Sequence, residues 1–416
     1  MGDWKEVKLK NLLLIPIRNG LTKPSAIRGK GVKMIGMKEI FAMDQIRSID
    51  MDRVPVNKKE FESSFIQVED LLFARQSLSL EGAGKCSIVV SVKEPTVFES
   101  HLIRLRIDKT KANPYYIYYY FKSSLGKNQI KTLVQQVAAA GIRGKELVEL
   151  TILLPSITEQ IRIASILKSL DDKIECNRRI NENLEQQALA LFKSWFVDFE
   201  PFKDQSFVES ELGMIPQGWK VLSFKDFIKP VSDKAPVGSL PEYSVTNNGI
   251  IPREAKFKKK LSSESSKNKI LRRDNLVFGM SREILNWGIM EDEIGGVSSA
   301  YNIYEIEKEK VTPTYLKLYM TAKISDFNSL IGTAAREGQS LDKGALMQKS
   351  IYIPTKIIEE SFLEKYNSII SLSKNYLEES HHLSDLRDTL LPRLMSGEIK
   401  VPDTDLINEM LEKGIR

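Results

Sequence analysis

The chain contains 416 residues, of which 42% are hydrophobic and 28% are charged, so two or three folded domains with ordinary cores are expected. Its formal net charge of +6 permits nucleic-acid binding without requiring it. Its two cysteines, Cys86 and Cys176, argue against a disulfide framework or a cysteine zinc site and favour a reducing, cytoplasmic setting. The N-terminal apolar run at 12–17 is too short for a signal peptide or a membrane span, and no other run approaches that length.

The first 155 residues alternate short apolar runs with loops. Buried strands are predicted at 70–75, 87–92 and 151–155, where apolar residues are contiguous. Pro114 precedes a tyrosine-rich run and is predicted to occupy the first turn of a helix. Because these tyrosines face several sides of that helix, we interpret them as packing residues, with base stacking as the less favoured alternative.

A stretch without glycine or proline, from Ser156 to Glu200, predicts one long helix capped by Ser156 or Thr158. Heptad-spaced residues form a narrow seam along it, which requires a partner helix. The predicted seam comprises Leu167, Leu170, Ile174, Asn177, Asn181, Leu184 and Leu191. Its two asparagines leave two interpretations open. The seam is wet or mis-phased by one residue, with Ile180 replacing Asn181, or a buried asparagine fixes the pairing of the helices. The acidic pair at 171–172 is interpreted as a solvated face.

The pattern of the first region returns after residue 200. The segments at 219–224, 275–279, 313–320 and 350–354 repeat those at 4–9, 70–74, 114–121 and 151–155. From Pro114 to Pro155 and from Pro313 to Pro354 are both 41 residues. Matching contexts at equal separation predict an internal structural repeat.

The second copy also ends in a predicted long helix, at 357–395, and Ser396 and Gly397 are expected to terminate it. Its seam is predicted at Ile369, Tyr376, Leu383 and Leu390. The fold class is therefore α+β: two α/β globular regions, joined and spaced by two long antiparallel helices that form a coiled coil, in a pseudo-two-fold repeat. The predicted boundaries are 1–155 and 201–354 for the globular regions and 156–200 and 355–416 for the helical segments.

No catalytic constellation stands out. The sequence has no GxxxxGK[ST] loop, its glycine pairs at 82–84 and 295–296 are typical of turns, and its three histidines are interpreted as surface or seam residues. A metal-dependent nuclease built on Asp233, Glu254 and Lys256 is a weak hypothesis, because such triplets are common in a chain rich in lysine and glutamate.

Basic loops recur in both globular regions and favour contacts with DNA phosphates, although any single cluster also fits ordinary surface solubility. The candidates in the first region are Arg18, Lys23, Arg28, Lys30, Arg75 and Lys85. Those in the second region are Lys256, Lys258, Lys259, Lys260, Arg272, Arg273 and Arg282.

Three motifs carry a resemblance to a known family. They are LPSITEQIRI at 154–163 with LDDKIECNRRINENLE at 170–185, GMIPQGW at 213–219, and LLPRLMSGEI at 390–399. Together they make the chain similar to the specificity subunits of type I restriction–modification systems. One departure is the segment after Pro354, which has Ile357-Ile-Glu-Glu where the first copy has Glu159-Gln160.

The resemblance implies a non-catalytic, sequence-specific DNA-binding subunit with two target-recognition domains. Each domain binds one half of a bipartite double-stranded target, and the helix pair sets their separation. The implied partners are two methyltransferase subunits, which methylate adenine, and restriction or translocase subunits. S-adenosylmethionine, ATP and magnesium would belong to those partners, with no cofactor, metal or membrane bound by this chain. The alternative from another class is a two-headed coiled-coil scaffold for protein or glycan ligands.

Overall fold

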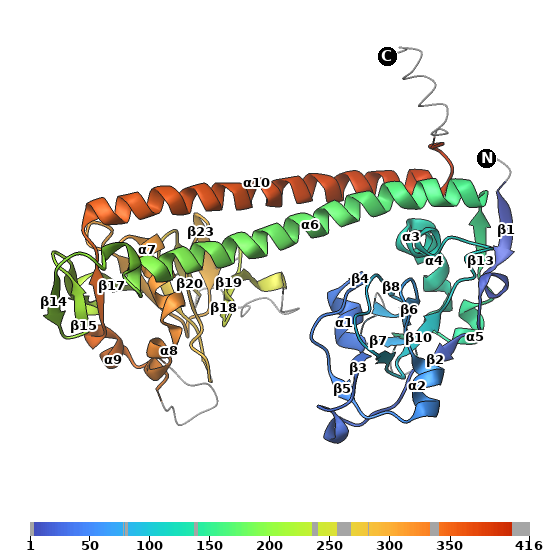
Figure 1. Cartoon of the computed structure of the whole chain (residues 1–416), viewed down its shortest axis with the longest axis horizontal. Helices are drawn as coiled ribbons and strands as arrows, with labels where there is room; N and C mark the ends of the chain where they lie inside the picture. The colour runs from blue at the N-terminus through green and yellow to red at the C-terminus, as the bar shows by residue number, and fades with distance from the viewer. Residues whose placement is uncertain are drawn as a thin grey trace, which may run out of the picture. The chain divides into compact units, whose positions relative to one another are not determined.

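The computed structural model describes residues 4–77, 79, 82–136, 140–234, 240–255, 268–281, 283–332 and 341–401. The chain divides into two compact units, residues 1–178 with 377–416 and residues 179–376. Each unit combines one globular region with segments of both long helices, α6 (Ile157–Phe196) and α10 (Lys356–Met395) (Figure 1).

The first unit is built on a five-stranded sheet in the order β2-β10-β6-β8-β4. Its inner strands are fully buried, and two of them lie in the segments 70–75 and 87–92 that were predicted to form strands. The bounds are β2 (Arg18–Asn19), β10 (Leu102–Leu105), β6 (Leu71–Ala74), β8 (Cys86–Val89) and β4 (Gln45–Ile46). Neighbouring strands are antiparallel except for β4, which pairs parallel to β8 at the edge of the sheet.

Shorter elements complete this unit. They are α1 (Met37–Ala42), α2 (Lys58–Ser64), α4 (Ser124–Leu133), α5 (Gly144–Leu147), a sheet of β5 (Arg53–Val54), β3 (Val32–Ile35) and β9 (Thr96–Phe98), and a sheet of β11 (Gln135–Gln136), β12 (Ala140–Gly141) and β7 (Gln76–Ser77).

The second unit repeats the main sheet in the order β17-β24-β21-β22, which corresponds to β2-β10-β6-β8. These strands are β17 (Ile228–Val231), β24 (Asn302–Ile306), β21 (Leu276–Phe278) and β22 (Trp287–Ile289). Other elements are β14 (Phe207–Ser210), β15 (Gly213–Pro216), β18 (Tyr243–Thr246), β19 (Gly249–Pro252), β20 (Lys269–Arg272), β23 (Ile294–Val297), α8 (Ile324–Phe327) and α9 (Lys343–Gln348).

The repeat predicted from the proline spacing is present in the fold. In the first unit β1 (Lys5–Lys8) pairs antiparallel with β13 (Thr151–Leu154), and in the second β16 (Lys220–Ser223) pairs antiparallel with β25 (Ser350–Ile353). The matching prolines begin α3 (Pro114–Lys122) and α7 (Pro313–Ala322), where their missing N–H is no loss. Asn113 and Thr312 cap these helices through their side chains. Tyr116, Tyr118, Tyr119 and Tyr120 are buried, so the tyrosine run is packing rather than an exposed stacking surface.

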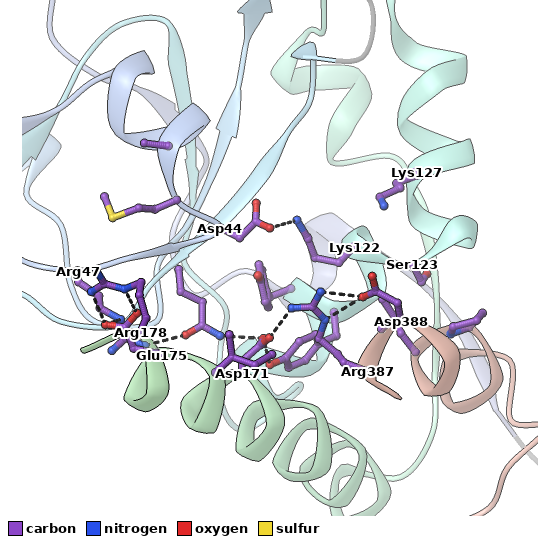
Figure 2. A pocket seen from close by; sticks show the side chains of 18 of the residues that line it. Asp44, Arg47, Lys122, Ser123, Lys127, Asp171, Glu175, Arg178, Arg387 and Asp388 are labelled. Atoms are coloured by element: carbon purple, nitrogen blue, oxygen red, sulfur yellow. Dashed lines mark hydrogen bonds and ion pairs between the residues drawn. The ribbon is translucent and has the colours of Figure 1, made fainter. Parts of the chain in front are cut away.

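The two long helices run antiparallel within the first unit. Asp171 of α6 pairs with Arg387 of α10 at 2.8 Å (Figure 2). Asn177 donates to Glu379 at 2.7 Å, so rising numbers on one helix meet falling numbers on the other. Asn177 is fully buried. The seam is therefore correctly phased at this residue and carries a polar contact between the helices.

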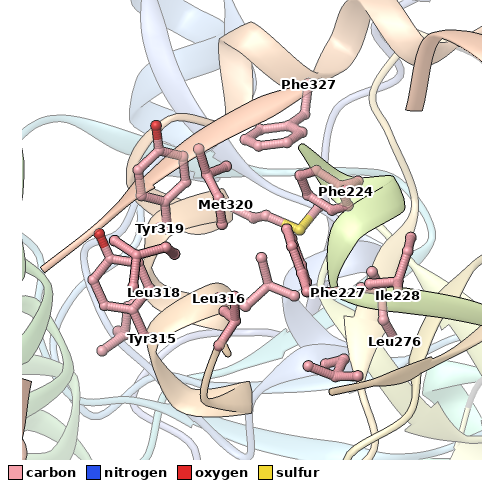
Figure 3. Close-up of a cluster of buried hydrophobic side chains, with 14 of the residues drawn as sticks. Phe224, Phe227, Ile228, Leu276, Tyr315, Leu316, Leu318, Tyr319, Met320 and Phe327 are labelled. Atoms are coloured by element: carbon pink, nitrogen blue, oxygen red, sulfur yellow. The ribbon is translucent and has the colours of Figure 1, made fainter. Parts of the chain in front are cut away.

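The second unit contains the other antiparallel segment and an aromatic core. Phe192 and Phe196 of α6 pack on Phe362 of α10, with ring centroids 5.7 and 4.9 Å apart. Figure 3 shows the neighbouring part of this core, where Phe224, Phe227 and Phe327 meet side chains of α7.

Both long helices have defined ends. Ser156, rather than Thr158, accepts from the N–H of Glu159 and caps α6. The helix stops at Phe196, four residues before Glu200, because Phe199 adopts a left-handed conformation with φ of 53°. Gly397 terminates α10 as predicted, with φ of 71°, a conformation that glycine adopts without strain.

The predicted seam residues are all buried or half-buried in the structure. Ile180 and Asn181 are both half-buried, so burial does not single out one of them. The two carboxylates of the predicted solvated face differ in exposure. Asp172 is exposed and pairs with Lys168, as predicted, whereas the Asp171 side chain is only 11% exposed. The expectation for Asp171 was wrong, because its position faces α10 and the globular region rather than water.

Candidate nucleic-acid interface

Three basic candidates of the first region are exposed or half-buried. Arg18 lies on the edge strand β2 and is exposed. Lys30 is exposed between Gly29 and Gly31, whose φ angles of 113° and 104° make a turn that holds the lysine outward. Arg75 directly follows β6 and is half-buried. No ion pair joins any of the three to another described residue, so within this part of the chain their charges are able to engage phosphates without first breaking a pair.

The other three candidates of the first region form ion pairs. Lys23 contacts Glu60 at 2.9 Å, with 11% of its side chain exposed. Arg28 contacts Asp52 at 2.7 Å. Lys85 contacts Asp44 at 3.3 Å and donates to the carbonyl of Phe41. These pairs reduce the positive field at the surface, and Lys23 in particular connects the loop after β2 to α2.

The structure describes two of the basic candidates in the second region. Arg272 and Arg273, at the end of β20, are exposed and contact Asp233 at 3.5 Å and Glu293 at 3.0 Å. The remaining candidates, Lys256, Lys258, Lys259, Lys260 and Arg282, lie outside the described residues.

The nuclease hypothesis finds no geometric support in the described part of the chain. Asp233 is engaged with Arg272, Glu254 is exposed, and Lys256 lies outside the described residues. Among the residues that the structure describes, no group of three histidine, cysteine or carboxylate side chains is placed to hold a metal ion. None of the described helices is long and apolar enough to cross a lipid bilayer.

The first unit contains a groove that the sequence did not predict. It has a volume of about 1020 Å³ and lies between the globular region and the two long helices (Figure 2). Four parts of the unit line the groove: the loop and strand at 42–49, the end of α3 with the start of α4, one face of α6, and the last turns of α10. Its charges are largely paired, including Asp44 with Lys122 at 2.5 Å and Arg47 with Glu175 at 3.3 Å.

Electrostatics in this groove follow from these pairs. Burial acts to raise the pKa of Asp44, but Lys122 and Lys85 outweigh it and hold the pKa below its ordinary value. Burial likewise acts to lower the pKa of Arg387, while hydrogen bonds to Asp171 and Asp388 raise it. Both groups are therefore charged at neutral pH. A sequence signal was present in the spacing of Asp171 and Glu175, which places both carboxylates on one face of α6.

The fold defines a class of protein in which two related α/β units carry basic loops and share a pair of long antiparallel helices. Residues 1–186 match the family model described as "Type I restriction modification DNA specificity domain". The match spans less than half of the chain, and it makes this part similar to the specificity subunits of type I restriction–modification systems.

Individual proteins of that kind are similar to this chain. The MjaIX specificity subunit of Methanocaldococcus jannaschii is 25% identical, over 96% of this chain and 94% of that protein. The EcoKI specificity subunit of Escherichia coli is 29% identical, over 43% of this chain and 40% of that protein. The crystal structure of an S subunit from M. genitalium is 13% identical, covers 97% of each chain, and has a TM-score of 0.50, which shows a shared fold.

Proposed function

We propose that this chain is the sequence-specific DNA-binding subunit of a restriction–modification complex and that it recognises a bipartite target. The observation that carries the proposal is the repeat. The main sheets of both units share the order of four strands, and in each unit a strand near the start of the region pairs antiparallel with the strand before a long helix, whereas the loop sequences differ. Residues 1–155 and 201–354 would each read one half-site, and the two half-sites would differ in sequence because the loops differ.

Two exposed basic residues and the half-buried Arg75 supply the physical basis for binding. Arg18, Lys30 and Arg75 would contact phosphates, and such contacts release condensed counterions, so affinity falls steeply as salt rises. The modest net charge of +6 suits a protein that shares its contact with DNA among several subunits.

The proposed role is non-catalytic. Two methyltransferase subunits would dock on the helix pair and methylate adenine, and restriction or translocase subunits would join them. S-adenosylmethionine, ATP and magnesium would be bound by those partners rather than by this chain, and the complex would act in the cytoplasm.

The decisive experiment maps methylated motifs in the host genome with this gene intact and deleted. A split adenine motif that disappears on deletion is expected. The purified complex with its methyltransferase should then bind a duplex carrying that motif more tightly than a scrambled duplex, with the advantage measured across a salt titration. Equal affinity for both duplexes at every salt concentration would refute the proposal and favour a scaffold for protein or glycan ligands.

A further inference from the structure

Asp171 gathers side chains from four separate elements of the first unit. Its carboxylate accepts from the amide of Gln45 at 2.9 Å, from the hydroxyl of Tyr119 at 2.7 Å and from the guanidinium of Arg387 at 2.8 Å (Figure 2). Gln45 belongs to β4, Tyr119 to α3, Asp171 to α6 and Arg387 to α10. We call these four residues the Asp171 cluster. It connects the globular region to both long helices at one point.

A second contact lies one helical turn away. Arg47 reaches Glu175 at 3.3 Å and also donates to Gln45 at 3.2 Å. Residues two apart along an extended chain point to the same side, and residues four apart on a helix share one face. Gln45 and Arg47 therefore match the spacing of Asp171 and Glu175. The edge of the sheet is fixed to α6 in one register, since sliding by one residue would break both contacts.

The cluster is sufficiently buried for its geometry to matter. The Asp171 side chain is 11% exposed and that of Arg387 is 28% exposed. Hydrogen bonds to charged groups are directional and stronger than neutral ones, whereas apolar contacts tolerate tilting and sliding. Such a polar cluster restricts the angle of the globular region on the helices more than an apolar contact of equal area would.

The second unit lacks this arrangement. The positions 199 residues from Tyr119, Asp171 and Arg387 in the repeat hold Leu318, Ile370 and Ala188, which are apolar. Among the described residues, its main sheet ends at β22 and has no counterpart of β4. The repeat thus offers a natural comparison, with a polar connection in one unit and apolar residues at the same positions in the other.

We propose that the Asp171 cluster is a specificity-determining device that fixes the orientation of the first globular region on the helix pair and thereby restricts the spacer length that the protein accepts between its half-sites. This inference rests on the proposed function. Lengthening a spacer by one base pair moves a half-site by about 3.4 Å along the DNA axis. It also rotates the half-site by about a tenth of a turn. A rigidly oriented region rejects that displacement, whereas a loosely held one follows it.

The test uses the complex of this chain with its methyltransferase partner. Methylation rates are measured on duplexes that carry the mapped motif with its native spacer or with a spacer one base pair longer or shorter. The main variant is Tyr119→Leu/Asp171→Ile/Arg387→Ala, which installs the residues of the second unit. Replacing a buried ion pair by apolar residues is often neutral for stability, so this variant is expected to fold.

The spacer selectivity, defined as the rate on the native spacer divided by the rate on the altered ones, is expected to fall about 5-fold or more in this variant, as a typical coupling between sites predicts. Half-site sequences should remain unchanged. Asp172→Asn is the matched control, because Asp172 is exposed on the same helix and its ion pair with a described residue is the local one with Lys168, and it should keep wild-type selectivity.

A second variant, Gln45→Ala/Arg47→Ala, removes the same connection from the sheet side and keeps the test valid if the first variant misfolds. Wild-type selectivity in folded protein of either variant, whatever its melting temperature, would overturn the inference. If the wild-type complex prefers no split duplex at all, the proposed function fails instead, so the two failures are distinguishable.

Discussion

The hydroxyl of Tyr116 donates a hydrogen bond of 2.9 Å to the backbone carbonyl of Leu153. In the second unit, 199 residues later, Tyr315 donates one of 2.8 Å to the carbonyl of Tyr352. The same bond thus joins the proline-initiated helix to the strand before the long helix in both units. Its recurrence indicates that it holds the helix to the strand in each copy.

Replacing Tyr116 or Tyr315 by phenylalanine should destabilise the protein by about 1–3 kcal/mol, because a buried carbonyl loses its donor. Thermal and urea denaturation of each variant would measure this. Tyr120→Phe is the control, since the hydroxyl of Tyr120 lies 3.5 Å from the carbonyl of Thr151 and makes at most a weak bond. An equal loss in the control would show that the ring contacts, and not the two short bonds, are responsible.

Glu359 should make the second unit sensitive to pH. Its counterpart Gln160 accepts from the N–H of Asn113 and donates to the carbonyl of Pro155 at 3.0 Å. Glu359 accepts from the hydroxyl of Thr312, and burial raises its pKa above the ordinary value of 4.5. The folded state therefore favours the protonated acid, and its stabilising effect is lost as pH rises above that ordinary value.

Glu359→Gln is accordingly expected to raise the melting temperature at pH 7 and to have little effect near pH 4. One recovered hydrogen bond of about 1 kcal/mol corresponds to about 2–4 °C for a unit of this size. Gln160→Glu should produce the opposite dependence in the first unit. Melting curves measured from pH 4 to 8 for both variants test the idea, and parallel curves for Glu359→Gln and the wild type would contradict it.

The buried pair of Asp70 and Arg106 should be a major determinant of stability in the first unit. Asp70 accepts two bonds of 2.7 Å from Arg106, and its side chain is only 1% exposed. Asp70→Asn leaves the arginine charge buried, which typically costs about 3–5 kcal/mol. Asp233→Asn removes the carboxylate of an exposed pair with Arg272 and should change stability by less than about 1 kcal/mol. Denaturation midpoints of the two variants that differ little would refute this ranking.

Exposed basic residues and basic residues held in ion pairs should contribute differently to DNA affinity. Arg18→Ala removes an exposed charge from an edge strand and should lower affinity for all duplexes, reducing the salt slope by about one. Its melting temperature should stay near the wild-type value. Lys23→Ala breaks the contact with Glu60 and should lower the melting temperature more than it changes the salt slope. The reverse pattern would assign the phosphate contact to Lys23.

Much of the fold could be predicted because its signals are local and repeated. Heptad spacing reflects the packing of apolar side chains between helices, whereas the prolines at equal separation and the glycine at 397 reflect backbone requirements that one residue type meets best. Even the departure at Ile357 is resolved by the same logic. Glu359 occupies the place of Gln160, so at this position a carboxyl replaces an amide while the position in the fold is kept.

The site was less predictable because it depends on distant partners. Lys23 and Arg18 look alike in a basic loop, and only the fold reveals that Glu60 lies beside one of them. Asp171 looked solvated for the same reason. Its neighbours Gln45 and Arg387 lie far away in the sequence, and neither belongs to a recognisable motif.

The Asp171 cluster also limits how freely the chain can be recombined. A graft that replaces residues 1–155 by the corresponding segment of another protein would remove Gln45 and Tyr119 and leave Asp171 and Arg387 on the recipient's helices. Asp171 and Arg387 would still pair with each other, but two of the donors to the Asp171 carboxylate would be gone. Chimaeras that carry glutamine and tyrosine at the equivalent positions should therefore be better tolerated than chimaeras chosen by overall similarity.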